Sequence, residues 1–168
     1  MWLPEHGGAT NEIVAISAAA ARFRIVRVSE QERGVLPNEQ SVSIAYQENL
    51  RYQVISYEGA AAGYTLTWDK LVKLPYMLHW GLQAVVPAEY IGKSIEIEQF
   101  IVTRHPLAKG KVDVTVMLTD GKPFGGLAAP HGDTRYGGGW SLEGRTLEEI
   151  HSMNFQVWRE EWNRKFGE

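Results

Sequence analysis

One stretch of the chain, residues 129–140 (APHGDTRYGGGW), concentrates the side chains that could do chemistry. Within it, His131 and Asp133 place an imidazole and a carboxylate two residues apart. That pairing suits a base with its orienting carboxylate, or two ligands of a metal ion. Arg135 adds a positive charge that could bind an anionic group. The other ligand-binding candidates are two aromatic residues of the same stretch and one histidine before it: Tyr136, Trp140 and His105.

The glycines around this stretch leave two interpretations open. Eight of the 17 glycines lie between Gly121 and Gly144, and glycine lets the backbone approach a ligand closely. The loop 124–140 either borders a ligand pocket or is only a long connection between the last strand and a terminal helix, since long loops tend to be functional or disordered. Neither G-x-G-x-x-G nor G-x-x-x-x-G-K-[ST] occurs, so nucleotide phosphate binding is not predicted.

Other reactive groups are absent or lack a catalytic pattern. The histidines show neither H-x-x-x-H nor H-E-x-x-H spacing, so no metal site is predicted. The chain has no cysteine, which excludes a thiolate nucleophile and a disulfide, and G-x-S-x-G does not occur. Glu96 and Glu98 share one face of an expected strand, and their alternation with isoleucine indicates a solvated outer face. We predict no cofactor, and the residues leave open whether the protein is an enzyme.

Charge and hydropathy limit the partners. A formal net charge of -3 gives no field that would attract nucleic acid or an anionic membrane. The N-terminus lacks the basic region of a secretory signal, and the apolar run from Ile13 to Ala21 is shorter than the roughly 20 residues that span a bilayer. We therefore expect a cytoplasmic protein that binds neither nucleic acid nor a membrane.

Two strands are expected just before the candidate site. From Lys111 to Thr119, valines and a leucine alternate with other residues at the period of a half-buried strand. Asp120 and Gly121 then predict a tight hairpin turn, and Pro123 suggests an edge position because it cannot donate a ladder hydrogen bond. Ser94 to Arg104 reads similarly, with a bulge near Gln99 or a strand end buried on both faces.

The rest of the chain mixes strands and helices. Ser41 to Gln47 and Arg51 to Tyr57 are expected to form a second hairpin. Thr67 can cap a short mid-chain helix, with a further turn from Tyr76 to Trp80. Thr146 and Glu149 form a capping box before a long terminal helix. The apolar residues that recur at helical spacing along it are Leu147, Ile150, Met153, Val157, Trp158, Trp162 and Phe166.

This order of elements predicts a single α+β domain over residues 1–168, with an antiparallel sheet packed by the C-terminal helix and the short mid-chain helix. A hot-dog-like arrangement, in which a sheet wraps around a helix, is the alternative. Two hypotheses of function follow. In the first, the protein binds a small organic ligand in a pocket bordered by the loop 124–140. In the second, it is an interaction module or homo-oligomer. Its contacts come from the edge strand near Pro123 and from the aromatic residues Trp158, Trp162 and Phe166 on the terminal helix.

Overall fold

The computed structural model describes residues 38–132 and 139–167, with side chains from Val42 onward. All of these residues belong to one compact unit, Leu36–Glu168. Residues 1–35 lie outside that unit, so the single domain over 1–168 stays a prediction.

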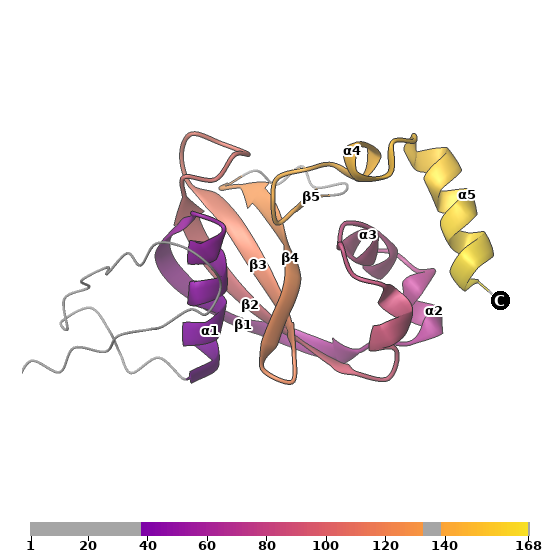
Figure 1. The fold of residues 1–168 in the computed structure, drawn as a ribbon, viewed down its shortest axis with the longest axis horizontal. Helices are drawn as coiled ribbons and strands as arrows, with labels where there is room; N and C mark the ends of the chain where they lie inside the picture. Colours follow the sequence, from indigo (N-terminus) through magenta and orange to yellow (C-terminus); the bar gives the residue numbers. More distant parts are fainter. Residues whose placement is uncertain (1–37, 133–138, 168) are drawn as a thin grey trace, which may run out of the picture. The chain divides into compact units, whose positions relative to one another are not determined.

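The unit is built on a five-stranded antiparallel sheet in the order β1-β2-β3-β4-β5 (Figure 1). Its strands are β1 (Gln53–Thr65), β2 (Ser94–Thr103), β3 (Val112–Thr119), β4 (Lys122–Pro130) and β5 (Trp140–Ser141). The helices are α1 (Asn38–Asn49), α2 (Trp68–Leu71), α3 (Tyr76–Gly81), the 3-10 helix η2 (Pro87–Tyr90), α4 (Leu147–His151) and α5 (Phe155–Phe166). The predicted α+β class is confirmed. None of the described helices has the length and apolar character needed to cross a membrane.

Helices pack on both faces of the sheet. Even-numbered residues of β2 and β3, such as Phe100 and Val114, share a buried cluster with residues of α1. Odd-numbered residues, such as Ile95 and Met117, belong to a second cluster with α2, α3 and α5. Because neighbouring side chains of a strand point to opposite faces, the two clusters are the two sides of one sheet. Figure 1 shows α1 and the α2–α3–α5 group on either side of it. The sheet therefore does not enclose one helix, as the hot-dog alternative requires.

Most of the short-range signals are confirmed. β3 ends in the predicted turn, where Asp120 and Gly121 take φ angles of 51° and 68°. The Thr67 side chain accepts a hydrogen bond from the Lys70 N–H, as expected of a helix cap. Thr146 and Glu149 form the capping box through two reciprocal hydrogen bonds. These features depend on neighbours within four residues, so the local sequence determines them.

The predicted hairpin over residues 41–57 is wrong, because Asn38–Asn49 is the helix α1. The alternation of Val42, Ile44 and Tyr46 with other residues suggested a strand. The fully buried positions of α1 are instead Ser43 and Gln47. Those two residues lie one helical turn apart and face the core, although both are polar. Val42 is exposed. The sequence of α1 therefore shows no amphipathic pattern, although one side of the helix is buried.

The long terminal helix is also corrected, since α4 and α5 are separate helices. Ser152 ends α4 in the left-handed region, at a φ of 54°. Asn154 then caps α5, because its Oδ1 accepts a hydrogen bond from the Val157 N–H at 3.0 Å. Trp158 and Trp162 are buried in the core of their own chain. They do not offer the subunit contact that the interaction hypothesis assigned to them.

β2 differs from expectation in two ways. Its pairing with β3 is unbroken from Glu96 to Val102, so β2 lacks the bulge near Gln99 that was one of the two expected explanations. The irregularities lie instead in β1, one of them between Tyr57 and Gly59. Glu98 is buried rather than solvated, and its Oε2 has no hydrogen-bond partner among the described residues. The outer-face interpretation was wrong because both faces of this sheet are covered.

Two adjacent glycines allow a side chain to bind the edge of β4. β5 pairs with β4 only at Leu127 and Ala128, which leaves the start of β4 with β3 as its one strand partner. There the Gln83 side chain accepts from the Gly126 N–H at 2.9 Å and donates to the Gly126 carbonyl at 3.1 Å. A Cβ atom on Gly125 would overlap Gln83, and one on Gly126 would overlap the Thr115 carbonyl. Close packing therefore requires both glycines.

We expect Gly126→Ala to lower the free energy of unfolding by about 1–3 kcal/mol, because the added methyl group meets backbone that cannot move aside. The matched control is Gly110→Ala, since a Cβ atom at Gly110 meets nothing within 4 Å. That variant should leave stability unchanged within about 0.5 kcal/mol. Urea denaturation of both variants measures the difference, and equal stabilities would contradict the packing argument.

Candidate functional site

His131 is held by a carboxylate from the neighbouring strand. Its Nδ1 lies 2.6 Å from Oδ1 of Asp113 on β3, and its backbone N–H donates to the Lys111 carbonyl at 3.1 Å. Both side chains are about half exposed, at 45% for His131 and 47% for Asp113. No described residue is hydrogen-bonded to the other ring nitrogen, Nε2. A carboxylate that orients an imidazole in this way is the arrangement found behind histidine bases and histidine metal ligands.

A bulge in β4 brings these two residues to the same face. Leu118 pairs with Pro123 and Met117 with Gly125, so Phe124 is an extra residue in β4. Beyond it, Asp113 lies opposite Ala129, and His131 is two residues further on the same side. Without the extra residue Asp113 would lie opposite Ala128, and His131 would point to the other face. The sequence analysis missed Asp113 because its partnership depends on this single bulge.

The other candidates do not all gather around His131. Trp140 pairs with Ala128, which belongs to the α1 side of the sheet, whereas Asp113 and Ala129 lie on the opposite side. The expected loop 124–140 is also shorter than predicted, because β4 continues to Pro130. The candidates Asp133, Arg135 and Tyr136 lie outside the described residues. Of the proposed set, the structure places only His131, Trp140 and His105.

His105 is a buried histidine with both ring nitrogens occupied. Nδ1 accepts a hydrogen bond from the Leu107 N–H at 3.1 Å, so Nε2 carries the proton and donates to the Leu142 carbonyl at 2.8 Å. The Tyr52 hydroxyl donates to the same carbonyl at 2.8 Å, and the Tyr52 and His105 rings lie 4.4 Å apart. His105 thus ties the turn after β2 to the segment after β5, and its nitrogens would have to leave these partners to bind a ligand.

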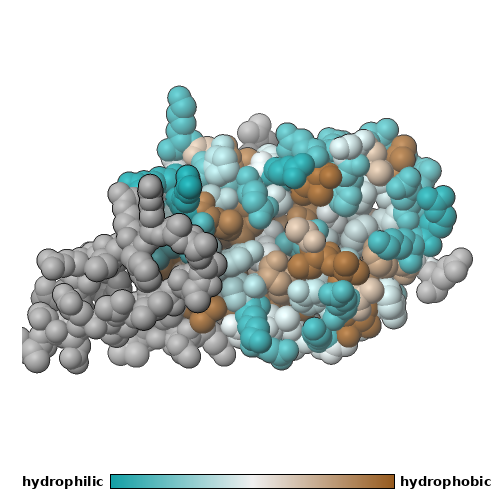
Figure 2. All heavy atoms as spheres, in the orientation of Figure 1, coloured by the Kyte–Doolittle hydropathy of each residue, from teal (hydrophilic) through white to brown (hydrophobic). Residues whose placement is uncertain are grey.

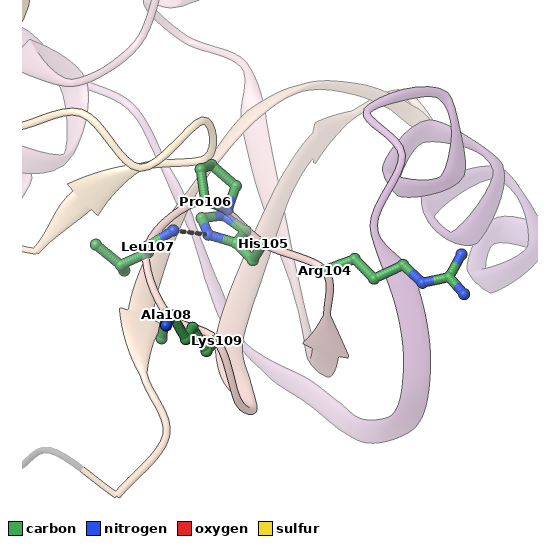
Figure 3. A pocket seen from close by; sticks show the side chains of 6 residues that line it. All are labelled: Arg104, His105, Pro106, Leu107, Ala108 and Lys109. Carbon is green, nitrogen blue, oxygen red and sulfur yellow. Dashed lines mark hydrogen bonds between the residues drawn. The ribbon is translucent and has the colours of Figure 1, made fainter.

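The turn that contains His105 forms a hollow of about 570 Å³ (Figure 3). Its lining comes from consecutive residues of one loop, 104–109. In Figure 3 the Arg104 side chain extends away from the loop, while Pro106 lies over the His105 ring. The hollow is therefore formed by a single turn, and His131 does not line it.

Nothing in the described part of the chain groups three or more His, Asp or Glu residues closely enough to hold a metal ion. Comparison of the chain with protein-family models, with curated proteins and with solved structures finds no match. The chemistry of the site is therefore argued from its geometry alone.

Stability should fall in mild acid because of His105. Burial lowers the pKa of this histidine below its ordinary 6.5, and the Leu142 hydrogen bond and Glu143 oppose that shift only in part. Below about pH 6.5 His105 is protonated in the unfolded chain but stays neutral in the folded chain, so acidification favours unfolding. Each such histidine contributes at most about 1.4 kcal/mol per pH unit.

Urea denaturation at pH 7.5 and 5.5, values chosen to lie about one unit on either side of the ordinary histidine pKa, tests this linkage. His79 also has a pKa lowered by burial, so the parent protein reports both groups. His105→Gln removes only one of them. The variant should lose less stability between the two pH values than the parent does. An identical loss in parent and variant would show that His105 does not take part.

Proposed function

We propose that the protein binds a small organic ligand at the end of the sheet where His131 and Asp113 meet. The single observation that supports this proposal is the 2.6 Å contact between Nδ1 and Oδ1, which orients the imidazole, while no described residue is hydrogen-bonded to Nε2. Ile101 and Ala129 flank Asp113 on the two neighbouring strands, and both are partly exposed. They give the ligand an apolar surface next to the polar contact, as in most small-molecule sites.

Residues beyond the described part extend the proposal. Arg135 would supply charge, and Asp133 and Tyr136 would supply polar contacts to the same ligand, because all three closely follow His131 in the sequence. Trp140 stays a ligand-binding candidate but lies further from His131, since it pairs with Ala128 on the opposite face of the sheet. Catalysis by the oriented imidazole is compatible with this arrangement, but ligand binding does not depend on it.

His131→Ala should abolish ligand binding with little effect on stability. The His131–Asp113 pair is half exposed, and exposed ion pairs contribute about 0–1 kcal/mol. Ligands are found by titrating a panel of small metabolites while following tryptophan fluorescence. The variant should lose the response, whereas Lys122→Ala, an exposed change at the far end of β4, should keep it. Asp113→Asn should weaken binding, because the amide orients the imidazole less firmly.

Two outcomes would overturn this proposal. One is a broad panel that gives no response with the parent protein. The other is a loss of well over 1 kcal/mol of stability in the variant in which His131, Asp133 and Arg135 are all replaced by alanine, since that loss indicates a structural role for the segment.

A second candidate function is self-association through β1. This strand is an edge of the sheet, spans 13 residues and has no partner on its outer side among the described residues. Ile55 on β1 is 48% exposed. Unpaired edges offer backbone donors and acceptors to a second copy, while the irregularities in β1 disfavour open-ended pairing. The proposal is therefore a closed dimer rather than a filament.

Light scattering at about 50 μM, well above a dissociation constant of about 1 μM, tests the dimer. The parent should be dimeric, and Ile55→Lys should make it monomeric by placing a charge at the paired edge. Val157→Lys is the control, because Val157 is a comparably exposed apolar residue on α5. A monomeric parent, or a dimer that both variants leave intact, would contradict self-association through β1.

A further inference from the structure

A groove lies between α4 and α5, on elements that the His131 site does not use. The left-handed Ser152 separates the two helices, and α5 sets off in a new direction beyond it (Figure 1). The concavity has a volume of about 440 Å³, within the range of small-molecule sites. We call it the α4–α5 groove. Its lining residues are His151, Met153, Trp158, Glu161, Trp162, Arg164 and Lys165.

The residues that α5 contributes follow from its helical repeat. Trp158, Glu161, Trp162 and Lys165 recur at intervals of three and four residues and so form one stripe along the helix. The two indole rings lie 5.0 Å apart and are mostly buried, so that only their edges, 3% of Trp158 and 8% of Trp162, are exposed. Met153, in the connection between the helices, lies at the other wall. The base of the groove is therefore made of Met153 and the exposed edges of the two indoles, while Arg164 and Lys165 bring positive charge to its rim. Figure 2 shows hydrophilic side chains over α5.

The two tryptophans differ in how their N–H groups are used. Trp162 donates to the Leu71 carbonyl at 2.7 Å, as a buried indole usually does. No described residue accepts from the Trp158 indole, although that side chain is only 3% exposed. The fully buried side-chain atoms without a hydrogen-bond partner all belong to other described residues, so the Trp158 indole nitrogen is in part accessible to solvent. The small accessible part of Trp158 therefore includes an unused hydrogen-bond donor, on a residue that lines the groove.

The neighbouring polar groups are mostly donors as well. His151 donates through Nε2 to the Gly81 carbonyl at 2.7 Å, which fixes the ring beside Trp158. Arg164 and Lys165 carry three or more N–H donors each and accept nothing. Glu161 is the one carboxylate among the lining residues. A ligand that suits this set must be apolar over most of its surface and must accept hydrogen bonds at one end.

We propose that the α4–α5 groove binds a small amphipathic carboxylate. Its hydrocarbon part lies on Met153 and the two indole rings, and its carboxylate accepts hydrogen bonds from the Trp158 N–H and from Arg164. A carboxylate is favoured over a neutral acceptor because hydrogen bonds between charged groups are about twice as strong as neutral ones. A phosphate monoester would carry a second negative charge toward Glu161, which the groove disfavours.

The test uses 3-phenylpropionate and octanoate, each beside its neutral amide. The indole N–H resonances of the full-length, isotope-labelled protein are followed by NMR and assigned by triple-resonance spectra. Both carboxylates should shift the Trp158 indole resonance in a saturable way, and the amides should bind about tenfold more weakly. Arg164→Gln should weaken carboxylate binding about tenfold. Arg159→Gln is the matched control, because Arg159 is an exposed arginine of the same helix outside the groove.

Each other outcome overturns the proposal. A Trp158 resonance that stays fixed up to about 10 mM ligand, beyond the range of a specific site, would show that the groove does not bind these carboxylates. Equal shifts from acid and amide would remove the role of charge. If Arg164→Gln and Arg159→Gln bind the carboxylates equally well, the carboxylate group does not contact Arg164. Because both arginines are exposed, these two substitutions leave the fold intact and keep the comparison readable.

Discussion

The register of β3 against β4 is the constraint on which the other features depend. Side chains alternate along a strand, so the register decides which residues face α1 and which face α2, α3 and α5. The Asp120–Gly121 turn starts this register, and the extra residue Phe124 shifts it once. A slip of one further residue would turn the side chains of β4 to the opposite faces and would separate His131 from Asp113. One local irregularity thus fixes both the core and the candidate site.

The parts of the fold that could be predicted are those with short-range causes. β3, its turn and the caps at Thr67 and Thr146 each depend on a few neighbouring residues. α1 could not be found in this way, because it buries Ser43 and Gln47 and exposes Val42. Helical periodicity reports the burial of apolar side chains, and here the buried positions are polar. The break before α5 did have a local signal, since Asn154 is a strong helix cap, but the apolar spacing on both sides concealed it.

The candidate site was predictable only in part. His131 was identified from its own type and setting, whereas its carboxylate partner lies 18 residues earlier and meets it through the bulge. His105 illustrates the opposite case, because its sequence position at a strand end favoured function while its surroundings give it two backbone partners. A histidine with both nitrogens occupied stabilises a loop. His131 differs, because Asp113 orients one ring nitrogen and no described residue is hydrogen-bonded to the other.

The concentration of glycines near His131 has several separate causes. Gly121 permits the positive φ angle of a hairpin turn, while Gly125 and Gly126 leave space for Gln83 and for the neighbouring strand. Gly144 also takes a positive φ angle, and a Cβ atom there would come within 3.3 Å of the His105 ring. Each of these positions answers a different steric demand, so their number is not evidence for a ligand-binding loop. The case for a site near residue 131 therefore depends on the oriented imidazole, and the glycines explain only how the chain can bring β4, Gln83 and His105 so close together.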